Sequence, residues 1–194
     1  MRAAWGRGNV ALGVFIDLKK AFDTVNHAIL LAKLEHYGVR EGALGLLASY
    51  SRGREQYVVY GGVESGRSRV ECGVPQGSVL GPLFFLLYVN DMVRVSGDLG
   101  FVLFADDTNL FAEAGDPDSL VTRVNGELAK LEVWFRCNRL TLNLKKTEFV
   151  YFSVPGGRGN LPGQVEVGGV GIEERASVRF LGSRWTGRLS GMAT

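Results

Sequence analysis

Cysteines are scarce in this sequence, and long hydrophobic runs are missing from it. Of 194 residues only Cys72 and Cys137 are cysteines, and neither has the CxxC or His-rich spacing of a metal site. We expect both to be reduced and structural. The longest apolar run, residues 79–89, is 11 residues long, whereas a bilayer requires roughly 20. This run therefore predicts a buried element, and the lack of a cleavable leader predicts an intracellular protein.

Charge of one sign is not in excess either. Lysine and arginine (22 residues) nearly balance aspartate and glutamate (20 residues), for a formal net charge of +2. Nucleic acid is neither required nor excluded as a partner, because a basic groove can exist within a balanced total. Hydrophobic content of 46% with 22% charged residues indicates a globular protein and excludes a disordered chain or a fibre. The length suits one domain with a substantial core.

Hydrophobic patterning predicts helices mixed with strands that are mainly joined by hairpins, which is an α+β fold. The apolar run 10–16 predicts a strand buried on both faces and ending at Asp17. Apolar residues at helical spacing predict helices over 22–37, 42–50, 78–92 and 116–140. The helix that starts near Ser78 is apolar nearly all round, so we expect it to be central. Further strands are predicted at 56–62, 68–73, 101–105, 108–112, 148–152 and 177–182, with a weak hairpin within 156–171.

The segment FADDTNLF at 104–111 places two aspartates between apolar residues. Its composition predicts a hairpin with Asp106 and Asp107 at the tip. If the strand ending at Asp17 pairs beside this hairpin, the carboxylates converge and raise one another's pKa unless a cation lies between them. Mg²⁺ suits such a place, because it binds through one or two carboxylates together with water and substrate phosphates. The simpler alternative is a solvated turn without a metal.

Three other segments favour the metal and a bound triphosphate. Phe22 begins a predicted helix whose first amides, near Lys20 and Ala21, could receive phosphate oxygens. In GVPQGS, the glycines and the proline leave Gln76 projecting just before a helix. NLKKTE places Lys146 near the start of a strand. Each has an ordinary alternative, namely a core aromatic residue, a turn and a solvated lysine.

Taken together, six segments resemble the reverse transcriptase of non-LTR retrotransposons of the jockey or CR1 type. They occur in the family's order over residues 10–182: VFIDLKKAFDTVNH, SRGREQYV, CGVPQGSVLGPLFFLLYVNDM, FADDTNLF, LTLNLKKTEFVYF and VRFLG. The fold that this resemblance implies is a polymerase palm, an antiparallel sheet backed by helices. The activity that it implies is RNA-directed DNA polymerisation, in which deoxynucleoside triphosphates extend a DNA primer on an RNA template.

The resemblance also implies roles for individual residues. Two Mg²⁺ ions, for which Mn²⁺ could substitute, would be held by Asp17 and Asp106, with Asp107 as a secondary carboxylate. Phe22 would exclude a 2′-hydroxyl, and Lys146 would be a possible proton donor near the departing pyrophosphate. The residues that would bind the nucleotide or template are Lys20, Ala21, Phe22, Gln76, Gly77 and Ala105. The residues that would grip the primer are Phe180, Leu181 and Gly182.

We expect residues 1–182 to form the reverse transcriptase domain, as a palm with part of the fingers, and 183–194 to be a divergent tail. The family's remaining fingers, its thumb and its endonuclease region are not recognisable here, so this chain would act with those parts of a larger element protein, in the cytoplasm and nucleus. Two alternatives remain. One is a catalytically silent element remnant that folds and at most binds nucleic acid. The other is a different palm enzyme, such as a nucleotide cyclase, against which Gln76 and Gly77 argue because a cyclase positions no primer or template.

Overall fold

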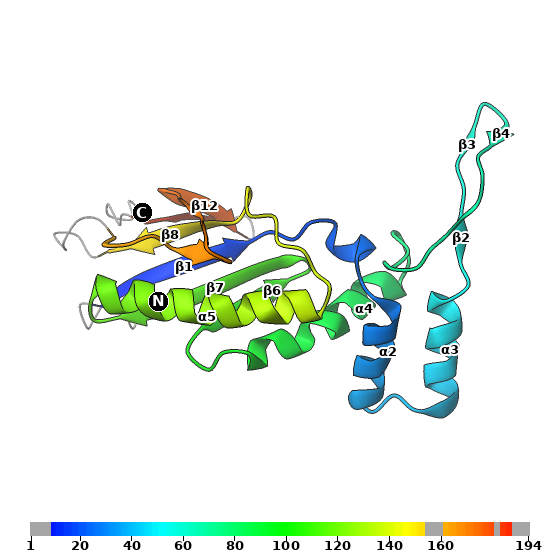
Figure 1. Ribbon diagram of the computed structural model, residues 1–194, viewed down its shortest axis with the longest axis horizontal. Helices are drawn as coiled ribbons and strands as arrows, with labels where there is room; N and C mark the ends of the chain where they lie inside the picture. Colours follow the sequence, from blue (N-terminus) through cyan, green and yellow to red (C-terminus); the bar gives the residue numbers. More distant parts are fainter. Residues whose placement is uncertain (1–8, 154–160, 181–182, 188–194) are drawn as a thin grey trace. The chain divides into compact units, whose positions relative to one another are not determined.

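The computed structural model describes residues 9–153, 161–180 and 183–187 (Figure 1). It divides into two compact units. The first, here called the sheet unit, comprises Met1–Lys19, Met92–Arg136 and Thr141–Thr194. The second, here called the helix unit, comprises Lys20–Asp91 and Cys137–Leu140. Helices and strands are mixed in the chain as the sequence predicts.

A five-stranded sheet forms the centre of the sheet unit. Its order is β11 (Glu173–Glu174), β8 (Glu148–Phe152), β1 (Val10–Ile16), β7 (Asp107–Ala114) and β6 (Gly100–Phe104). The predicted central position of β1 is confirmed, with antiparallel partners on both sides. β6 and β7 form the predicted hairpin. The sheet is not wholly antiparallel, because the short edge strand β11 runs parallel to β8.

Both faces of β1 are covered, because its side chains alternate between them. Leu12 and Val14 lie beside Val124 and Leu128 of α5 (Pro117–Cys137), which runs along the sheet in Figure 1. This helix begins where the sequence predicts, since Asp116 Oδ1 accepts a hydrogen bond from the backbone N–H of Ser119 at 2.9 Å.

On the other face of β1, Ala11 and Phe15 join an apolar cluster with β12 (Ser177–Phe180). β12 is the predicted last strand, but a further strand that the sequence does not predict, β13 (Ser183–Thr186), pairs with it antiparallel. Trp185 of β13 contacts the rings of Phe111, Phe152 and Phe180. The weak hairpin expected within 156–171 is present as β9 (Glu166–Val167) and β10 (Val170–Gly171).

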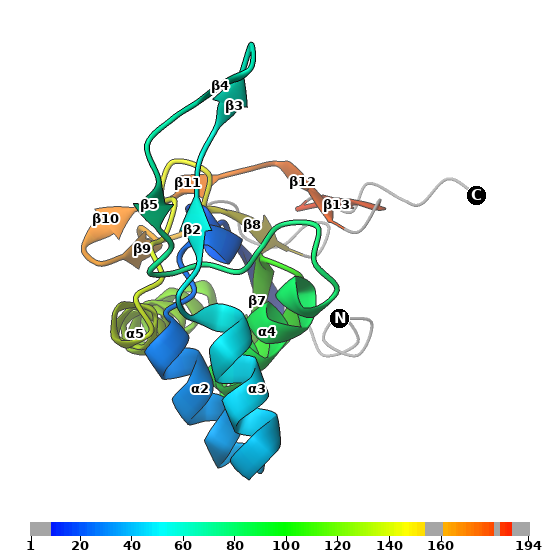
Figure 2. The same ribbon diagram turned by 90° about the vertical axis from the view of Figure 1, so that its right-hand side faces the viewer.

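The helix unit begins with a helix that is interrupted, not continuous. In place of one helix over 22–37, a short 3-10 helix η1 (Ala21–Asp23) precedes α2 (His27–His36). The cause is Asn26, whose backbone is extended and whose side-chain oxygen accepts a hydrogen bond from the N–H of Ile29 at 3.1 Å. Asparagine in this role starts a new helix. α3 (Glu41–Ser51) follows and lies beside α2, close to its predicted range (Figure 2).

The apolar helix α4 (Leu80–Val89) is buried on one side only, and η2 (Asn90–Arg94) continues from it as a 3-10 helix. Phe84, Phe85 and Tyr88 are buried, but Leu83 and Leu86 are 48% and 47% exposed. The expected central position therefore holds for one face of the helix, while the other face is exposed. The N-cap of α4 is Val79, and the hydroxyl of the preceding Ser78 accepts a hydrogen bond from the N–H of Gly81 at 3.0 Å.

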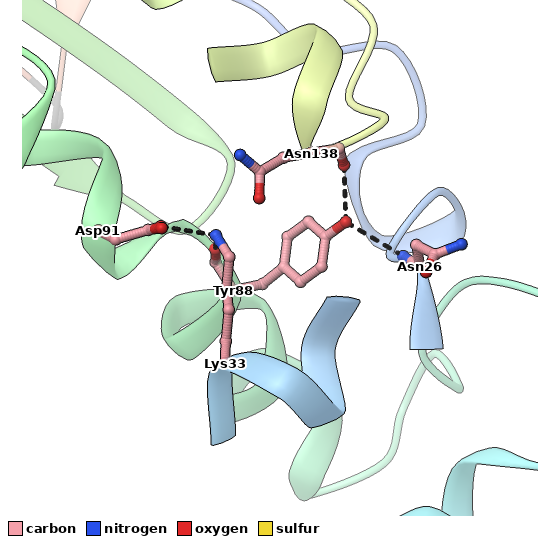
Figure 3. A network of polar contacts seen from close by, with 5 residues as sticks. All are labelled: Asn26, Lys33, Tyr88, Asp91 and Asn138. Carbon is pink, nitrogen blue, oxygen red and sulfur yellow. Dashed lines mark hydrogen bonds and ion pairs between the residues drawn. The ribbon is translucent and has the colours of Figure 1, made fainter. Parts of the chain in front are cut away.

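Polar groups buried among these helices form a connected network (Figure 3). The Lys33 ammonium of α2 donates to the carbonyl oxygen of Tyr88 and to Asp91 Oδ1, both at 2.6 Å. Burial lowers the pKa of Lys33, while the hydrogen bond and the charge of Asp91 oppose this change. This partly buried pair, in which the Asp91 side chain is 36% exposed, links α2 to η2, and the bond to the Tyr88 carbonyl links α2 to α4.

The residues between α3 and α4 in the sequence form an extended hairpin arm (Figures 1 and 2). It consists of two short ladders, β2 (Glu55–Gln56) with β5 (Ser68–Arg69) and β3 (Val59–Tyr60) with β4 (Val63–Glu64). The hairpin is predicted correctly, but its turn is tighter than expected, because Gly61 and Gly62 alone separate β3 from β4. Cys72, which follows the arm, is exposed, as is Cys137. Neither cysteine fills the core, so the expected structural role is wrong.

Candidate active site

Within the sheet unit, the candidate metal-binding residues lie at the end of the sheet where two neighbouring strands, β1 and β7, place their aspartates. Asp17 follows β1 directly, and Ile16 pairs with Thr108 of β7. Asp107 is already the first residue of β7 and pairs with Phe104, so the hairpin turn consists of Ala105 and Asp106. The prediction that both aspartates lie at the tip is thus correct for Asp106 only. The predicted adjacency of the strand ending at Asp17 and the FADD hairpin is confirmed.

The three carboxylates of this region interact electrostatically. The pKa of Asp107 is raised, first by partial burial of its carboxyl group and then by the negative charges of Asp106 and Asp17. Mutual repulsion of this kind is what a bound cation would relieve. Ala105, at the turn, has a φ of 51°, in the left-handed region that costs a residue with a side chain about 1–2 kcal/mol. Strained residues of this kind cluster at functional sites.

A turn that is distant in the sequence, which contains Asn143 and Thr147, is hydrogen-bonded to Asp17. The Asn143 side-chain amide donates to Asp17 Oδ2 at 2.8 Å, and the Asn143 backbone N–H donates to the Asp17 carbonyl oxygen at 2.8 Å. Asp17 N–H in turn donates to the Thr147 hydroxyl at 3.3 Å. Lys146 lies in this turn with an exposed side chain. Sequence reasoning found Lys146 but not Asn143 or Thr147.

The residues at this edge fit a magnesium site completed by substrate. Within residues 9–153, 161–180 and 183–187, no group of three or more aspartate, glutamate, histidine or cysteine side chains is arranged to hold a metal ion. Mg²⁺ does not require such a group, because it usually keeps several waters and takes one or two carboxylates together with substrate phosphates. Neighbouring carboxylates on rigid strand ends supply that kind of ligand.

The helix unit, taken by itself, contains a pocket of about 800 Å³. Two of the predicted nucleotide-binding residues, Lys20 and Gln76, line it, together with the guanidinium-bearing Arg54 and Arg69. The Gln76 amide donates to Asp23 Oδ1 at 3.0 Å. The pocket thus offers both cationic groups and an oriented amide to a polar ligand.

Gln76 is positioned by a turn that is bonded to η1 and to the residues just after it. The backbone N–H groups of Gly73 and Val74 donate to the carbonyl oxygens of Val25 and Phe22, both at 2.8 Å. Gly73 has a φ of 88°, and a Cβ there would lie 2.8 Å from the carbonyl oxygen of Asp23. This position therefore requires glycine, as the unusual backbone predicted for GVPQGS implies.

Phe22 is half-buried, and its ring centroid lies 4.8 Å from that of Phe85. The expected helix amides near Lys20 and Ala21 are not an α-helical N-terminus, because η1 is only three residues long. Lys20 itself has a left-handed φ of 49°. The start of an α-helix predicted at these residues is therefore wrong, while their binding of phosphate stays a prediction.

The remaining predicted site residues have different environments. Gly77 is exposed with a φ of 79°, and Phe180 is buried beside Phe15 and Trp185. Leu181 and Gly182 lie outside the described residues. Of the described helices, none has the length and apolar character needed to cross a membrane.

Comparison with known proteins identifies the family to which the chain belongs. The model of the family described as reverse transcriptase (RNA-dependent DNA polymerase) matches residues 2–185. The chain belongs to the reverse transcriptase family. This membership agrees with carboxylates at a sheet edge, since reverse transcriptases depend on divalent metal ions, and it decides against the nucleotide cyclase alternative.

Among its relatives, this reverse transcriptase is 30% identical over 173 residues to the probable RNA-directed DNA polymerase from transposon X-element of Drosophila melanogaster. It is 27% identical to the RNA-directed DNA polymerase from mobile element jockey of the same organism. The alignments cover 87% and 89% of this chain but 19% of each relative. The Pol polyprotein of retrotransposable element R2 from Popillia japonica is 28% identical, over 75% of this chain and 25% of the relative. The resemblance to non-LTR retrotransposon polymerases is confirmed, and this chain spans about a fifth of the two Drosophila proteins.

Solved structures support the same fold. Apo telomerase from Candida tropicalis, truncated from the C-terminal domain, superposes with a TM-score of 0.63 at 16% identity, over 91% of this chain and 34% of that one. Telomerase from Candida albicans, in complex with a fragment of telomeric RNA, gives a TM-score of 0.58 at 16% identity, over 91% of this chain and 29% of that one. This chain therefore shares the fold of the matched parts of these telomerases over 91% of its length.

Proposed function

We propose that this chain is the palm, with part of the fingers, of an RNA-directed DNA polymerase that copies the RNA of a non-LTR retrotransposon. The observation that carries the proposal is the meeting of Asp17 with the Asp106–Asp107 hairpin at one edge of the central sheet. Family membership supports it, because the family model matches nearly the whole chain.

In this proposal Asp17 and Asp106 hold two Mg²⁺ ions, or Mn²⁺ in their place, and Asp107 is a secondary ligand. The chemistry that such ions supply when bound is activation of the primer 3′-hydroxyl and stabilisation of the leaving pyrophosphate. The raised pKa of Asp107 supports a metal site here, because bound cations would offset the charges of Asp106 and Asp17 that contribute to it. Lys146, exposed in the turn beside Asp17, would donate a proton to the departing pyrophosphate.

The nucleotide and the template would be positioned by the other predicted residues. Phe22 would exclude a ribose 2′-hydroxyl, and its contact with the ring of Phe85 supports a fixed orientation for that role. Gln76 and Gly77 would line the nucleotide and template pocket, with Lys20 and Ala21 nearby in the chain. Ala105 would face the primer end, and the segment Phe180, Leu181 and Gly182 would grip the primer. Base pairing, and not side chains, would read the template sequence.

The partners are therefore an RNA template, a DNA primer and deoxynucleoside triphosphates. Because the Drosophila relatives are about five times as long as the matched region, we propose that the rest of the fingers, the thumb and an endonuclease belong to a larger element protein. Such a protein would assemble with its RNA in the cytoplasm and act in the nucleus.

Calorimetry on the purified chain tests the proposal. We expect binding of a deoxynucleoside triphosphate that requires Mg²⁺ or Mn²⁺ and becomes stronger with a primer-template. Asp17→Asn and Asp106→Asn should each abolish this metal-dependent binding. Asp98→Asn, which changes an exposed aspartate of the same unit, should leave it unchanged.

Failure of the wild-type chain to bind the nucleotide, in a sample with a cooperative unfolding transition, would reject the metal site. It would favour the alternative of a silent remnant that at most binds nucleic acid. In a full-length element polymerase, Asp106→Asn should likewise abolish nucleotide incorporation, and more than a few per cent of residual activity would contradict the metal assignment.

A further inference from the structure

Residues 143–147, here called the Asn143 turn, are bonded to Asp17 through both backbone and side chain. The Asn143 N–H and its side-chain amide each donate to Asp17, at 2.8 Å, to the carbonyl oxygen and to Oδ2 respectively. Next to them, Lys19 N–H donates to the carbonyl oxygen of Thr141 at 2.8 Å, and Leu18 pairs with Leu142. The chain that leaves β1 is thus held by a segment more than a hundred residues away.

Thr147 closes the turn on itself and on Asp17. Its hydroxyl accepts a hydrogen bond from the Asp17 N–H at 3.3 Å and donates one to the carbonyl oxygen of Asn143 at 3.1 Å. The same carbonyl oxygen accepts hydrogen bonds from the backbone N–H groups of Lys146 and Thr147, both at 2.9 Å. Thr147 is only 1% exposed. The turn is therefore held together by its own hydrogen bonds. These bonds fix the backbone of Asn143, which carries the side-chain amide.

The terminal torsion of an aspartate side chain is otherwise broad and roughly two-fold, so a free carboxylate samples many orientations. A hydrogen bond to Oδ2 restricts that torsion and leaves the other oxygen available. Asparagine is a neutral donor, so it orients the carboxylate without neutralising the charge that a cation needs. A lysine in that place would neutralise the charge of the carboxylate. The two lysines of the turn, Lys145 and Lys146, are both exposed.

We propose that Asn143 is a positioning residue that fixes the carboxylate of Asp17 for metal binding, and that Thr147 holds Asn143 in place. This inference rests on the proposed function of Asp17 as a metal ligand. Partners that orient a metal-binding side chain in this way typically contribute about 10–100-fold to metal affinity. The LNLKKTE segment thus acquires a role beyond the proton donor expected at Lys146.

Mn²⁺ binding by the purified 194-residue chain, measured by electron paramagnetic resonance, tests the inference without an activity assay. Asn143→Ala should weaken Mn²⁺ binding about 10-fold or more. The matched control is Asn125→Ala, because Asn125 is also half-buried and donates from its side chain to a carbonyl oxygen, that of Gln164, at 2.9 Å. That variant should bind Mn²⁺ like the wild type.

A second pair of variants separates positioning from general damage to the fold. Thr147→Ser keeps the hydroxyl and should retain Mn²⁺ affinity, whereas the isosteric Thr147→Val should lose affinity in the same direction as Asn143→Ala. Urea unfolding of each variant establishes that the chain is folded.

The outcomes also distinguish this inference from the proposed function. If Asp17→Asn abolishes Mn²⁺ binding while Asn143→Ala and Thr147→Val bind normally, the positioning role is overturned and the metal site stands. If the wild-type chain binds no Mn²⁺, the metal site itself is rejected, and the positioning role with it.

Discussion

The Tyr88 hydroxyl lies 2.6 Å from the carbonyl oxygen of Asn138 and donates a hydrogen bond to it, at a position where the tyrosine is fully buried. The same hydroxyl accepts a hydrogen bond from the backbone N–H of Asn26 at 3.4 Å. Burial raises the pKa of Tyr88. One phenol thus joins α4 to the start of α2 and to the segment that follows α5 (Figure 3).

Tyr88→Phe should therefore lower the free energy of unfolding by about 1–3 kcal/mol, because it leaves a buried carbonyl group without its partner. Urea unfolding measures this change. Tyr60→Phe is the control, since Tyr60 is 87% exposed on the hairpin arm and its hydroxyl can bond to water. Equal stability of Tyr88→Phe and the wild type would contradict the bridging role.

Gly73→Ala and Gly77→Ala should differ in their effect on stability, although both glycines have left-handed backbones. Each alanine incurs about 1–2 kcal/mol of backbone strain. Only at Gly73 does the new Cβ also meet backbone atoms of Asp23, whereas Gly77 has open space around it. We expect the free energy of unfolding to fall by about 1–3 kcal/mol more in Gly73→Ala than in Gly77→Ala. Thermal unfolding of the two variants measures the difference, and equal losses would show that the turn moves freely away from Asp23.

Phe22→Val should reduce discrimination against ribonucleotides. The smaller side chain would leave room for a 2′-hydroxyl, so ATP should compete better with dATP for Mg²⁺-dependent binding to the chain. Competition binding measures the ratio of the two affinities. Tyr60→Val, which removes a distant exposed ring, should leave the ratio unchanged. An unaltered ratio in folded Phe22→Val would remove the steric role proposed for this ring.

Glu127→Gln should alter the pH dependence of stability. The hydrogen bond from Lys130, at 2.6 Å, is the main cause that lowers the pKa of buried Glu127 below its ordinary value of 4.5. A lowered pKa in the folded state contributes stability above pH 4.5 that is lost as the pH falls through the folded-state pKa. The stability difference between wild type and variant should therefore be largest near pH 7 and shrink in acid. Urea unfolding at several pH values measures it, and a difference that does not vary with pH would contradict this account.

The parts of the fold that sequence predicts best are those with strong local signals. The apolar run ending at Asp17 predicts a central buried strand, and the periodic face of α5 with Asp116 before it predicts that helix. The double aspartate between extended residues predicts a hairpin. In each case, burial and turn chemistry act within a few neighbouring residues, so a single sequence is sufficient.

What the sequence does not predict depends on distant partners or on competing local signals. Asn143 reaches Asp17 across 126 positions, and no local pattern encodes that pairing. Apolar residues at helical spacing predict one continuous helix over 22–37, although the sequence also shows Asn26, a residue that can cap a new helix. The two local signals compete, and spacing alone does not predict the interruption before α2. Leu83 and Leu86 are exposed although they belong to an apolar helix, because composition does not say how many faces of a helix are covered.

The central position of β1 has a consequence for the timescale on which the site can open. The backbone amides of β1 are bonded to β7 on one side and to β8 on the other, so their hydrogens can exchange with solvent only when the sheet separates. Amides of the hairpin arm, which has only two-residue ladders, exchange through local fluctuations. The backbone that carries Asp17 should thus be among the slowest to exchange in the protein, so the site keeps its geometry through many local openings elsewhere.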